Sequence, residues 1–235
     1  MTTTPNTAIQ TTNSAAEPWS LSAEGTLQDL LAEHLVPMPL WKRAIDIMGA
    51  LAGIIITLPL LIAIGIAVAL ESPGGPLFRQ VRIGKNGKAF NCYKFRTMVK
   101  DADAMKASLM DQNEANGHIF KMKNDPRRTR LGVFLRKSSL DELPQLWNVL
   151  KGDMSLVGPR PPVPGEVALY TPAHLRRLTV VPGITGLWQV TLRGHHDFAD
   201  MVLLDTQYAE NLSFALDVKI LFRTVTTVLT GSGSC

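Results

Sequence analysis

The segment LRKSSLDELPQLWNVLKGDMSLVGPRPP, residues 135–162, surrounds two adjacent carboxylates, Asp141 and Glu142, with basic side chains. Arg136 precedes the pair and Arg160 follows it. Guanidinium groups bind phosphate oxygens through paired hydrogen bonds and offset the repulsion between a phosphate and a carboxylate. The segment therefore predicts a site that transfers a phosphorylated group, and we expect the rest of the chain to hold that site at a membrane.

The same carboxylates also fit a purely structural pattern. Ser139 and Glu142 have the spacing of a capping box, in which a hydroxyl and a carboxylate cap the first amides of a helix. Pro144 weakens this alternative, because a proline past the first turn disturbs a helix and is better accommodated near its first residue. Asp141 and Glu142 are then expected in the approach to a helix, where free amides can face a phosphate.

Length and composition indicate one domain with appendages. The 235 residues are enough for a hydrophobic core, and the two cysteines, Cys92 and Cys235, have no metal-type spacing and form no disulfide framework. This cysteine usage indicates a reducing compartment. Residues 1–40 hold four acids and no lysine or arginine, whereas residues 71–235 hold 22 basic and 15 acidic side chains. A basic body favours anionic partners: phosphate substrates, nucleic acid or an anionic membrane.

A run of 24 residues without a charge, Ile47–Leu70, predicts insertion into a membrane. A helix of that length can cross a hydrocarbon core of about 30 Å. Pro59, near its middle, predicts a break or kink. Basic residues flank both ends and favour the cytoplasm, so we expect a re-entrant hairpin that leaves through the face it entered, with a simple kinked span as the alternative. The flanking residues are Lys42, Arg43, Arg79, Arg82, Lys85 and Lys88.

Local patterns predict the elements on either side of this run. Residues 1–20 are polar and low in apolar content, which predicts disorder. The pattern of residues 21–35 predicts a short amphipathic helix, which ends before Pro37 and Pro39. Asn86–Gly87, between two alternating apolar runs, indicates a β-hairpin. An exposed polar helix is expected over 100–117.

The C-terminal part of the chain predicts a turn and two helices. Residues 181–189 form the expected turn into a short apolar segment. His195 and His196 have no partners at metal-ligand spacing, so we expect them in a loop. Helices are expected over 197–211 and 214–230, and the last of them either lies in the bilayer interface or packs on the domain.

Together these elements predict an α+β, mostly helical chain. Residues 1–40 are an N-terminal extension, and residues 41–71 are the re-entrant membrane helix, a helix interrupted by a break. Residues 72–235 are a small cytosolic catalytic domain with a short β-hairpin and interfacial amphipathic helices.

The chain resembles the monotopic bacterial phosphoglycosyl transferases, sugar-1-phosphate transferases that initiate capsule, exopolysaccharide and O-antigen assembly. The resemblance covers nearly everything from residue 42 to about residue 223, and it is to a short form of the family. Members often have Ser-Pro at the break in the membrane helix, whereas this chain has Leu58–Pro59, and we expect Thr57 to bond a freed carbonyl instead. The matching stretches are Lys42–Arg43 with Asp46, Pro73–Pro76, Gln80 with Arg82, Lys94–Met98, Asp125–Arg127, Arg136–Gln145, Gly152–Pro161, Pro182–Gln189, and Asp205 with Tyr208.

The resemblance implies transfer of a hexose-1-phosphate from a UDP-sugar to polyprenyl (undecaprenyl) phosphate, with release of UMP. It implies that Asp141 is the nucleophile of a covalent aspartyl-phosphosugar intermediate and that Glu142, beside Asp141, helps hold Mg²⁺. An aspartate with an ordinary pKa near 3.9 is ionised at neutral pH, so no general base is expected. The substrate-binding residues implied by position are Lys94, Arg96, Arg136, Arg160, Pro161, Asp205, Tyr208 and Asp217.

The resemblance also implies a place in the cell and a set of partners. We expect a monotopic protein on the cytoplasmic face of the inner membrane, in contact with membrane lipid and without nucleic acid. One alternative is a non-enzymatic membrane adaptor, with the acidic pair as a helix cap. The other is a membrane-tethered nucleic-acid binder that uses the basic residues between Arg127 and Lys137. The sequence leaves open which sugar is transferred and whether the chain forms a homo-oligomer.

Overall fold

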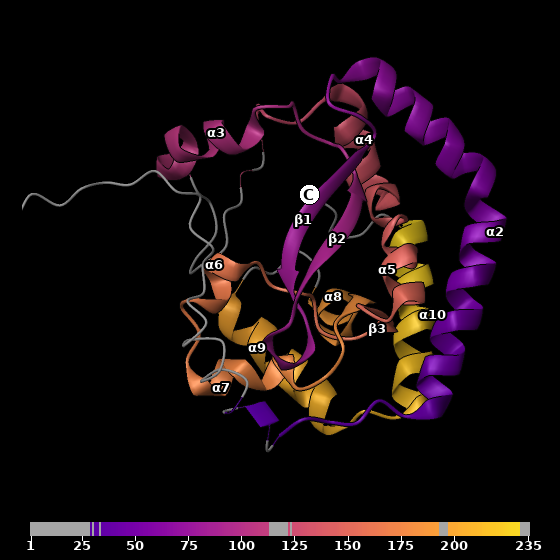
Figure 1. The fold of residues 1–235 in the computed structure, drawn as a ribbon, viewed down its shortest axis with the longest axis vertical. Helices are drawn as coiled ribbons and strands as arrows, with labels where there is room; N and C mark the ends of the chain where they lie inside the picture. Colours follow the sequence, from indigo (N-terminus) through magenta and orange to yellow (C-terminus); the bar gives the residue numbers. More distant parts are fainter. Residues whose placement is uncertain are drawn as a thin grey trace, which may run out of the picture.

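A computed structural model of the chain describes residues 29, 31, 32, 34–112, 122, 124–192 and 197–230 (Figure 1). The disorder predicted over 1–20, most of the helix predicted over 21–35, and both His195 and His196 lie outside these residues. The helices are α2 (Leu40–Glu71), α3 (Ala102–Lys106), α4 (Arg130–Ser138), α5 (Gln145–Lys151), α6 (Pro164–Val167), α7 (Pro172–Leu175), α8 (Leu187–Thr191), α9 (Phe198–Glu210) and α10 (Phe214–Thr230). The strands and 3₁₀ turns are β1 (Leu77–Ile83), η1 (Lys85–Gly87), β2 (Ala89–Phe95), η2 (Ala107–Gln112), η3 (Leu140–Glu142), β3 (Ser155–Val157), η4 (Arg176–Leu178) and β4 (Gly183–Thr185). This mixture is the α+β, mostly helical chain that the sequence predicts.

The predicted hairpin is present as the antiparallel pair β1 and β2. Ile83 pairs with Ala89, and Asn86 and Gly87 at the tip have φ of 57° and 71°. Positive φ at both positions is the reason that an Asn-Gly pair favours such turns. The polar helix expected over 100–117 consists, as far as the structure describes it, of the two short elements α3 and η2.

A second, parallel pair of strands, β3 and β4, was not predicted. Its strands are only three residues long, and Ser155 pairs with Gly183 across some 28 residues of chain. The pairing brings two loops so close together that a Cβ on Gly158 would meet the carbonyl oxygen of Val181. A Cβ on Gly183 would likewise meet the backbone nitrogen of Gly158. Two glycines therefore let the segment that ends in Arg160 lie against β4.

Helix α2 contains the whole apolar run predicted for the membrane, and Figure 1 shows it bending along its length. It is the helix in the described residues that is long and apolar enough to cross a membrane. The helix continues through Pro59, so the interruption predicted within 41–71 is wrong, although Pro59 has no N–H for the carbonyl of Ile55. Thr57 Oγ1 donates instead to the carbonyl of Gly53 at 2.7 Å, so the expectation that Thr57 serves the freed carbonyl is wrong. Such a bond to the preceding turn itself bends helices.

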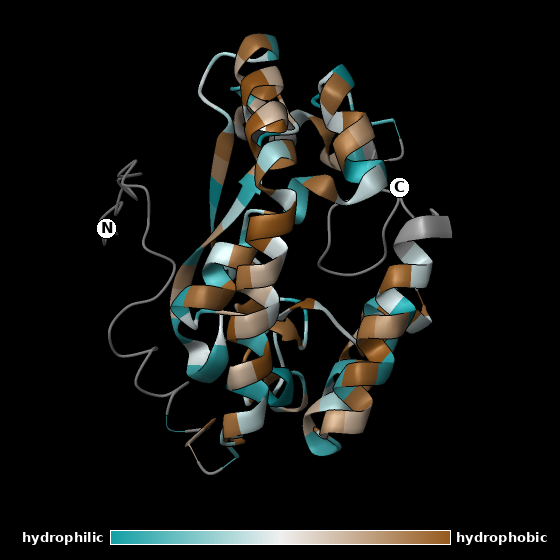
Figure 2. Cartoon of the chain, turned by 90° about the vertical axis from the view of Figure 1, so that its right-hand side faces the viewer, coloured by the Kyte–Doolittle hydropathy of each residue, from teal (hydrophilic) through white to brown (hydrophobic). Residues whose placement is uncertain are grey.

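Both halves of α2 lie against the same folded domain. In the first half, Ala50 packs in a cluster with Leu146 of α5. In the second half, Ile64 packs in a cluster with Phe95 of β2 and Leu135 of α4. Figure 2 looks onto α2 and shows hydrophobic residues along much of its outer side. The outward residues include Ile55, Ile56, Leu58, Ile62, Ile66 and Leu70, of which Ile56 is 78% exposed.

Helices α9 and α10 confirm the two helices predicted near the C-terminus. One side of α10 packs on the domain, since Ile220 is fully buried in a cluster with Val157 and Tyr208. The other side leaves Phe222 and Val225 exposed, at 72% and 58%. Packing on the domain is therefore the confirmed alternative for this helix, and contact of the exposed side with lipid is part of the proposal below.

Candidate active site

The adjacent carboxylates lie on η3, the single turn that joins α4 to α5. Ser139 ends α4 with a φ of 58°, and this left-handed conformation turns the chain sharply. Pro144 follows as the N-cap of α5, so Asp141 and Glu142 lie in the approach to the helix, as predicted. Asp141 is 7% exposed and Glu142 is partly exposed. The turn thus presents one buried and one accessible carboxylate side by side.

Strand β2 brings Lys94 to the second of these carboxylates. Its Nζ lies 2.5 Å from Oε1 of Glu142, and the two side chains are 21% and 30% exposed. The amide of Ser139 is bonded within α4, to the carbonyl of Arg136. Because the Glu142 carboxylate bonds to a lysine and the Ser139 amide to α4, the capping-box alternative is wrong.

The pKa values of the two carboxyl groups in this turn are shifted in opposite directions. Burial, and then the charge of Glu142, raise the pKa of Asp141 to about 6, although Lys94 and Arg136 act in the opposite direction. Burial also acts to raise the pKa of Glu142, but Lys94, then Arg160, outweigh it and the pKa is lowered. Glu142 is therefore the charged partner across the usual pH range, and Asp141 is the group that gains its charge near neutrality.

The raised pKa corrects one expectation from the sequence. Asp141 does not have an ordinary aspartate pKa; it reaches its full charge only above about pH 7. At pH 7 it is roughly nine-tenths ionised, so it still needs no general base to act as a nucleophile.

Arg136 supports Asp141 from α4. Its Nε donates to Oγ1 of Thr97 at 2.9 Å, which orients the guanidinium at the end of β2. Burial lowers the pKa of Arg136, while the nearby charge of Asp141 raises it. The structure therefore places Arg136 next to Asp141, as its position in the sequence implies.

A further arginine, Arg82, belongs to this cluster and was not among the predicted site residues. It is 6% exposed; Nη1 donates to the carbonyl of Pro161 at 2.7 Å, and Nη2 and Nε donate to Oε1 of Gln80 at 2.6 and 3.0 Å. Burial and the nearby charge of Arg160 lower its pKa to about 10. Two guanidinium groups so close together favour an anion between them. The signal in the sequence was the alternation that places Gln80 and Arg82 on one face of β1.

Asp205 lies in a different set of contacts. It pairs with Arg177, whose Nη2 is 2.5 Å from Oδ2 of Asp205 and 3.1 Å from the carbonyl of Arg160. Nη1 of Arg177 donates to the hydroxyl of Tyr170 at 2.7 Å. Arg177 is 2% exposed, so Asp205 supports the backbone of Arg160 through a buried arginine and does not face the carboxylate pair.

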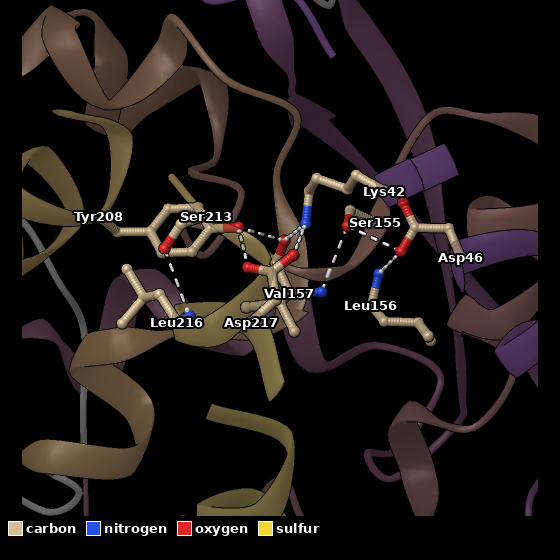
Figure 3. A network of polar contacts seen from close by, with 9 residues as sticks. All are labelled: Lys42, Asp46, Ser155, Leu156, Val157, Tyr208, Ser213, Leu216 and Asp217. Carbon is tan, nitrogen blue, oxygen red and sulfur yellow. Dashed lines mark hydrogen bonds and ion pairs between the residues drawn. The ribbon is translucent and has the colours of Figure 1, made fainter. Parts of the chain in front are cut away.

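Tyr208 and Asp217 form a buried network with the first turn of α2 (Figure 3). Lys42 Nζ lies 2.6 Å from Oδ2 of Asp217 and donates to the carbonyl of Val157 at 2.9 Å. The hydroxyl of Tyr208 donates to Oδ1 of Asp217 at 2.8 Å and lies 3.0 Å from the carbonyl of Val157. Both oxygens of Asp217 thus have protein partners. We call these four residues the α2 anchor.

Asp46, one turn further along α2, strengthens the same junction. Its Oδ1 accepts from the hydroxyl of Ser155 at 2.9 Å and from the amide of Leu156 at 2.8 Å, as Figure 3 shows. Both partners belong to β3, the strand that leads directly to Gly158–Pro161. The membrane helix is therefore bonded to the strand that positions Arg160.

Two other basic residues lie away from the carboxylate pair. Arg96 donates to the carbonyls of Gly75 and Gly74, at 3.0 and 2.9 Å, in the turn after α2. Arg127, which the nucleic-acid alternative needs at the surface, is 4% exposed and pairs with Asp125 at 2.6 Å. The structure thus groups Asp141, Glu142, Lys94, Arg136, Arg160, Pro161 and Arg82, and it does not add Arg96, Asp205, Tyr208 or Asp217 to that group.

Residues 38–231 match the bacterial sugar transferase family, and the chain belongs to this family. The match begins just before α2 and ends in the last residues of α10, so it includes the membrane helix, the carboxylate pair and the α2 anchor.

Several relatives are similar over about four fifths of this chain. Galactosyl transferase CpsE of Streptococcus agalactiae is 47% identical over 195 residues, which are 82% of this chain and 43% of that protein. The undecaprenyl-phosphate galactose phosphotransferase of Salmonella typhimurium is 44% identical, again over 82% of this chain and 41% of its own length. Exopolysaccharide production protein ExoY of Rhizobium meliloti is 41% identical over 82% of this chain and 87% of its own length. The chain thus spans less than half of the first two proteins and most of the third.

Proposed function

We propose that this protein transfers a hexose-1-phosphate from a UDP-sugar to undecaprenyl phosphate, or another polyprenyl phosphate, and releases UMP. The main support is the charge arrangement of the carboxylate pair: the buried Asp141 is ionised near neutral pH with Lys94 and Arg136 close to it, and Arg160 and Arg82 act on the adjacent Glu142. Relatives named as a galactosyl transferase and as an undecaprenyl-phosphate galactose phosphotransferase support the substrate class.

In the first step, a carboxylate oxygen of Asp141 attacks the phosphorus that bears the sugar. The bond from that phosphorus to the oxygen of UMP breaks, and UMP leaves with the electron pair. In the second step, a phosphate oxygen of the polyprenyl phosphate attacks the same phosphorus and frees the carboxylate. Dividing the transfer in this way means that the soluble donor and the lipid acceptor need not be bound at once.

The main obstacle to this reaction is the repulsion between the phosphate and the carboxylates, and the cations of the site reduce it. A negative phosphate and a carboxylate about 4 Å apart repel each other by about 4 kcal/mol at an effective dielectric near 20. Lys94, Arg136 and the pair Arg82 and Arg160 offset that repulsion and position the pyrophosphate. Burial of Asp141 adds to the effect, since its charge is less stabilised by water than that of an exposed aspartate.

The donor set of the site fits a magnesium ion. The described residues contain no group of three or more His, Cys, Asp or Glu side chains that could hold a metal. Mg²⁺ in phosphate-transferring sites is commonly held by one or two carboxylates together with substrate phosphates and water. Asp141 and Glu142 supply that number of carboxylates, and Lys94 bonds to Oε1 of Glu142 and leaves Oε2 for the metal. The ion would neutralise charge that develops on the phosphate oxygens.

Changing Glu142 to Gln tests the metal role. We expect the variant to fold normally and to require several-fold more Mg²⁺ for half-maximal UMP release, because one ligand charge is lost. A magnesium response identical to that of the unmodified protein would exclude Glu142 as a ligand.

We further propose that α2 enters and leaves the membrane on the cytoplasmic face. Its first turn is bonded to β3 and α10 through the α2 anchor, and its second half packs on Phe95 and Leu135. A straight span would carry one end of the helix across the bilayer and away from the domain. Contacts of both halves with one charged domain are what a re-entrant helix requires, and the exposed Phe222 and Val225 of α10 would lie in the same interface.

Incubation of the detergent-solubilised protein with donor alone is the direct experiment. We expect release of at most one UMP per protein in the presence of Mg²⁺, together with a mass increase equal to one hexose phosphate on a peptide that contains Asp141. Adding polyprenyl phosphate should remove the adduct and restart UMP release. Lipid product without any adduct would overturn the covalent scheme, and no product with any UDP-hexose would favour the adaptor alternative.

The sugar follows from the same assay. Two of the similar proteins are named as transferases of galactose phosphate and of N-acetylgalactosamine phosphate. UDP-galactose and UDP-N-acetylgalactosamine are therefore the first donors to compare, and UDP-glucose is the third.

A further inference from the structure

Asn148, in the middle of α5, is completely buried and bonds to strand β2 on both sides of Cys92. Its Oδ1 accepts from the backbone amide of Tyr93 at 3.0 Å, and its Nδ2 donates to the backbone carbonyl of Asn91 at 2.7 Å. A third bond runs from Nδ2 to Oδ2 of Asp153 at 3.2 Å. The side-chain amide thus takes the place that a neighbouring strand would have along β2.

No strand in the described residues pairs with the edge of β2 to which Asn148 binds. In the part of the chain that the structure describes, the sheet consists of β1 and β2, and β1 occupies the opposite edge of β2. In a strand, residues two apart direct their amide and carbonyl groups to the same edge, which is why one side chain can bond to both Asn91 and Tyr93. The two bonds from Asn148 to Asn91 and Tyr93, which we call the Asn148 clamp, therefore hold β2 against α5 in one register.

The clamp lies directly between the two halves of the active site. Cys92 and Lys94 share one face of β2, and Cys92 packs in the cluster with Leu146 and Val149 of α5. Lys94 follows two residues later and reaches Glu142, which lies three residues before α5 begins. The distance from the lysine to the carboxylate pair thus depends on how β2 sits on α5.

We propose that Asn148 is a positioning residue for the transfer proposed above: its amide holds β2 on α5 so that Lys94 reaches Glu142. Asn148 does not touch substrate in this role. It acts through Lys94, whose charge lowers the pKa of both Glu142 and Asp141. Loss of the clamp lets Lys94 move away from Glu142, so the lysine no longer offsets the charge of the carboxylate pair or of a phosphate that approaches it.

The experiment compares Asn148→Ala with Asp153→Ala in the full chain. Asn148→Ala removes both bonds to β2, and we expect kcat for UMP release at pH 7 to fall about 10- to 100-fold. Asp153→Ala removes the third partner of the same amide but leaves β2 clamped, so its kcat should match that of the unmodified protein. Equal losses in the two variants, or a kcat for Asn148→Ala that matches the unmodified protein, would overturn the proposal.

A double-variant cycle identifies the path of the effect. In the Lys94→Met background, Asn148→Ala should cost less than about threefold, because the group on which it acts is already gone. Fully additive losses would overturn the proposal. If Asn148→Ala loses its cooperative unfolding transition, Asn148→Asp takes its place, since it has the same shape, keeps the acceptor for Tyr93 and lacks the donor for Asn91.

Amide hydrogen exchange in β2, without any donor, separates this proposal from the proposed function. The Tyr93 amide, which bonds to Oδ1 of Asn148 at 3.0 Å, should exchange faster in Asn148→Ala than in Asp153→Ala. Failure of the unmodified protein to release UMP would sink the proposed transfer but leave this exchange rate decisive for the clamp. Unchanged exchange at Tyr93 would overturn the clamp whatever the reaction is.

Discussion

Two of the lysine–carboxylate pairs in the described residues have nearly the same length and different surroundings. Lys42 and Asp217 lie 2.6 Å apart with side chains 3% and 6% exposed, whereas Lys94 and Glu142 lie 2.5 Å apart with side chains 21% and 30% exposed. In the first pair, Tyr208 and the carbonyl of Val157 complete the hydrogen bonds. The second pair has a third charge beside it. A lysine–carboxylate contact therefore says little by itself; burial and neighbouring groups decide what it does.

The physical difference is the balance of charge. In the α2 anchor, Lys42 bonds to Asp217 and to the carbonyl of Val157, and both oxygens of Asp217 have protein partners, which is what a buried pair needs to be tolerated; the nearby Asp46 is held separately by Ser155 and Leu156. At the site, Asp141 adds a second carboxylate that is buried and repelled by the first, and its pKa rises to about 6. Such an arrangement lowers the stability of the free protein and favours a ligand that supplies compensating groups.

The largest effect should come from Asp141→Asn. Transfer should fall by about 10⁴-fold or more, because the proposed nucleophile is removed. The variant should also be more stable than the unmodified protein, by roughly 3 kcal/mol at pH 7.5. The sign follows from the raised pKa: ionising Asp141 in the folded protein costs free energy as pH rises from about 4 to about 6, and asparagine avoids that cost.

Urea unfolding of Asp141→Asn at pH 7.5 and pH 4 measures this stabilisation. The gain should shrink to well below 1 kcal/mol at pH 4, where the aspartate is protonated in the folded state and about half ionised in the unfolded state. Asp217→Asn, in the α2 anchor, is the matched control and should destabilise instead. A variant at Asp141 that is less stable than the unmodified protein would contradict the charge balance described here.

The next largest effect should be the loss of stability in Lys42→Met. Removing one partner of a buried pair leaves an uncompensated charge and costs about 3–5 kcal/mol. The double variant with Asp217→Leu should recover part of the loss, since both charges are then absent. Thermal unfolding in detergent measures both. Equal destabilisation by the single and double variants would show that the pair is not what holds α2 to the domain.

Lys94→Met should have the opposite pattern of effects from Lys42→Met: a large effect on activity and a small effect on stability. The pair is partly exposed, so its removal should cost less than about 1 kcal/mol. UMP release should fall about 10- to 100-fold at pH 7, and the acidic limb, expected near pH 6 in the unmodified protein, should move upward because Lys94 lowers the pKa of Asp141. A pH profile of kcat/KM measures this. A limb that stays in place would mean that Lys94 does not set the charge of Asp141.

The smallest effect should come from Arg96→Gln. Its guanidinium bonds to the turn carbonyls of Gly74 and Gly75 rather than to the carboxylate pair. We expect KM for the donor to change less than about threefold, whereas Arg82→Gln should raise it by tenfold or more, because a charged hydrogen bond to a phosphate contributes about 1.5–3 kcal/mol. Equal increases in KM for Arg96→Gln and Arg82→Gln would show that Arg96 belongs to the substrate-binding site.

The sequence predicted the parts of this protein that depend on local pattern. The uncharged run, the Asn-Gly turn, the two C-terminal helices and the position of Asp141 and Glu142 before a helix all follow from spacing, proline and charge over short windows. These features need no knowledge of the rest of the chain, because a helix, a hairpin or a membrane segment is specified by neighbouring residues.

Only the tertiary structure could assign partners to charged residues that are far apart in the chain. Asp205 and Asp217 looked like site carboxylates, yet one pairs with Arg177 and the other with Lys42, 175 residues away. Arg82 had only the weak signal of alternation in β1, and the contacts of Asn148 were not predicted, because the roles of both arise where β1, β2 and α5 meet. The pKa of Asp141 was likewise hidden, since it depends on burial and on charges from three separate segments. Sequence alone determined which chemistry was present, and packing decided which carboxylates were free to perform it.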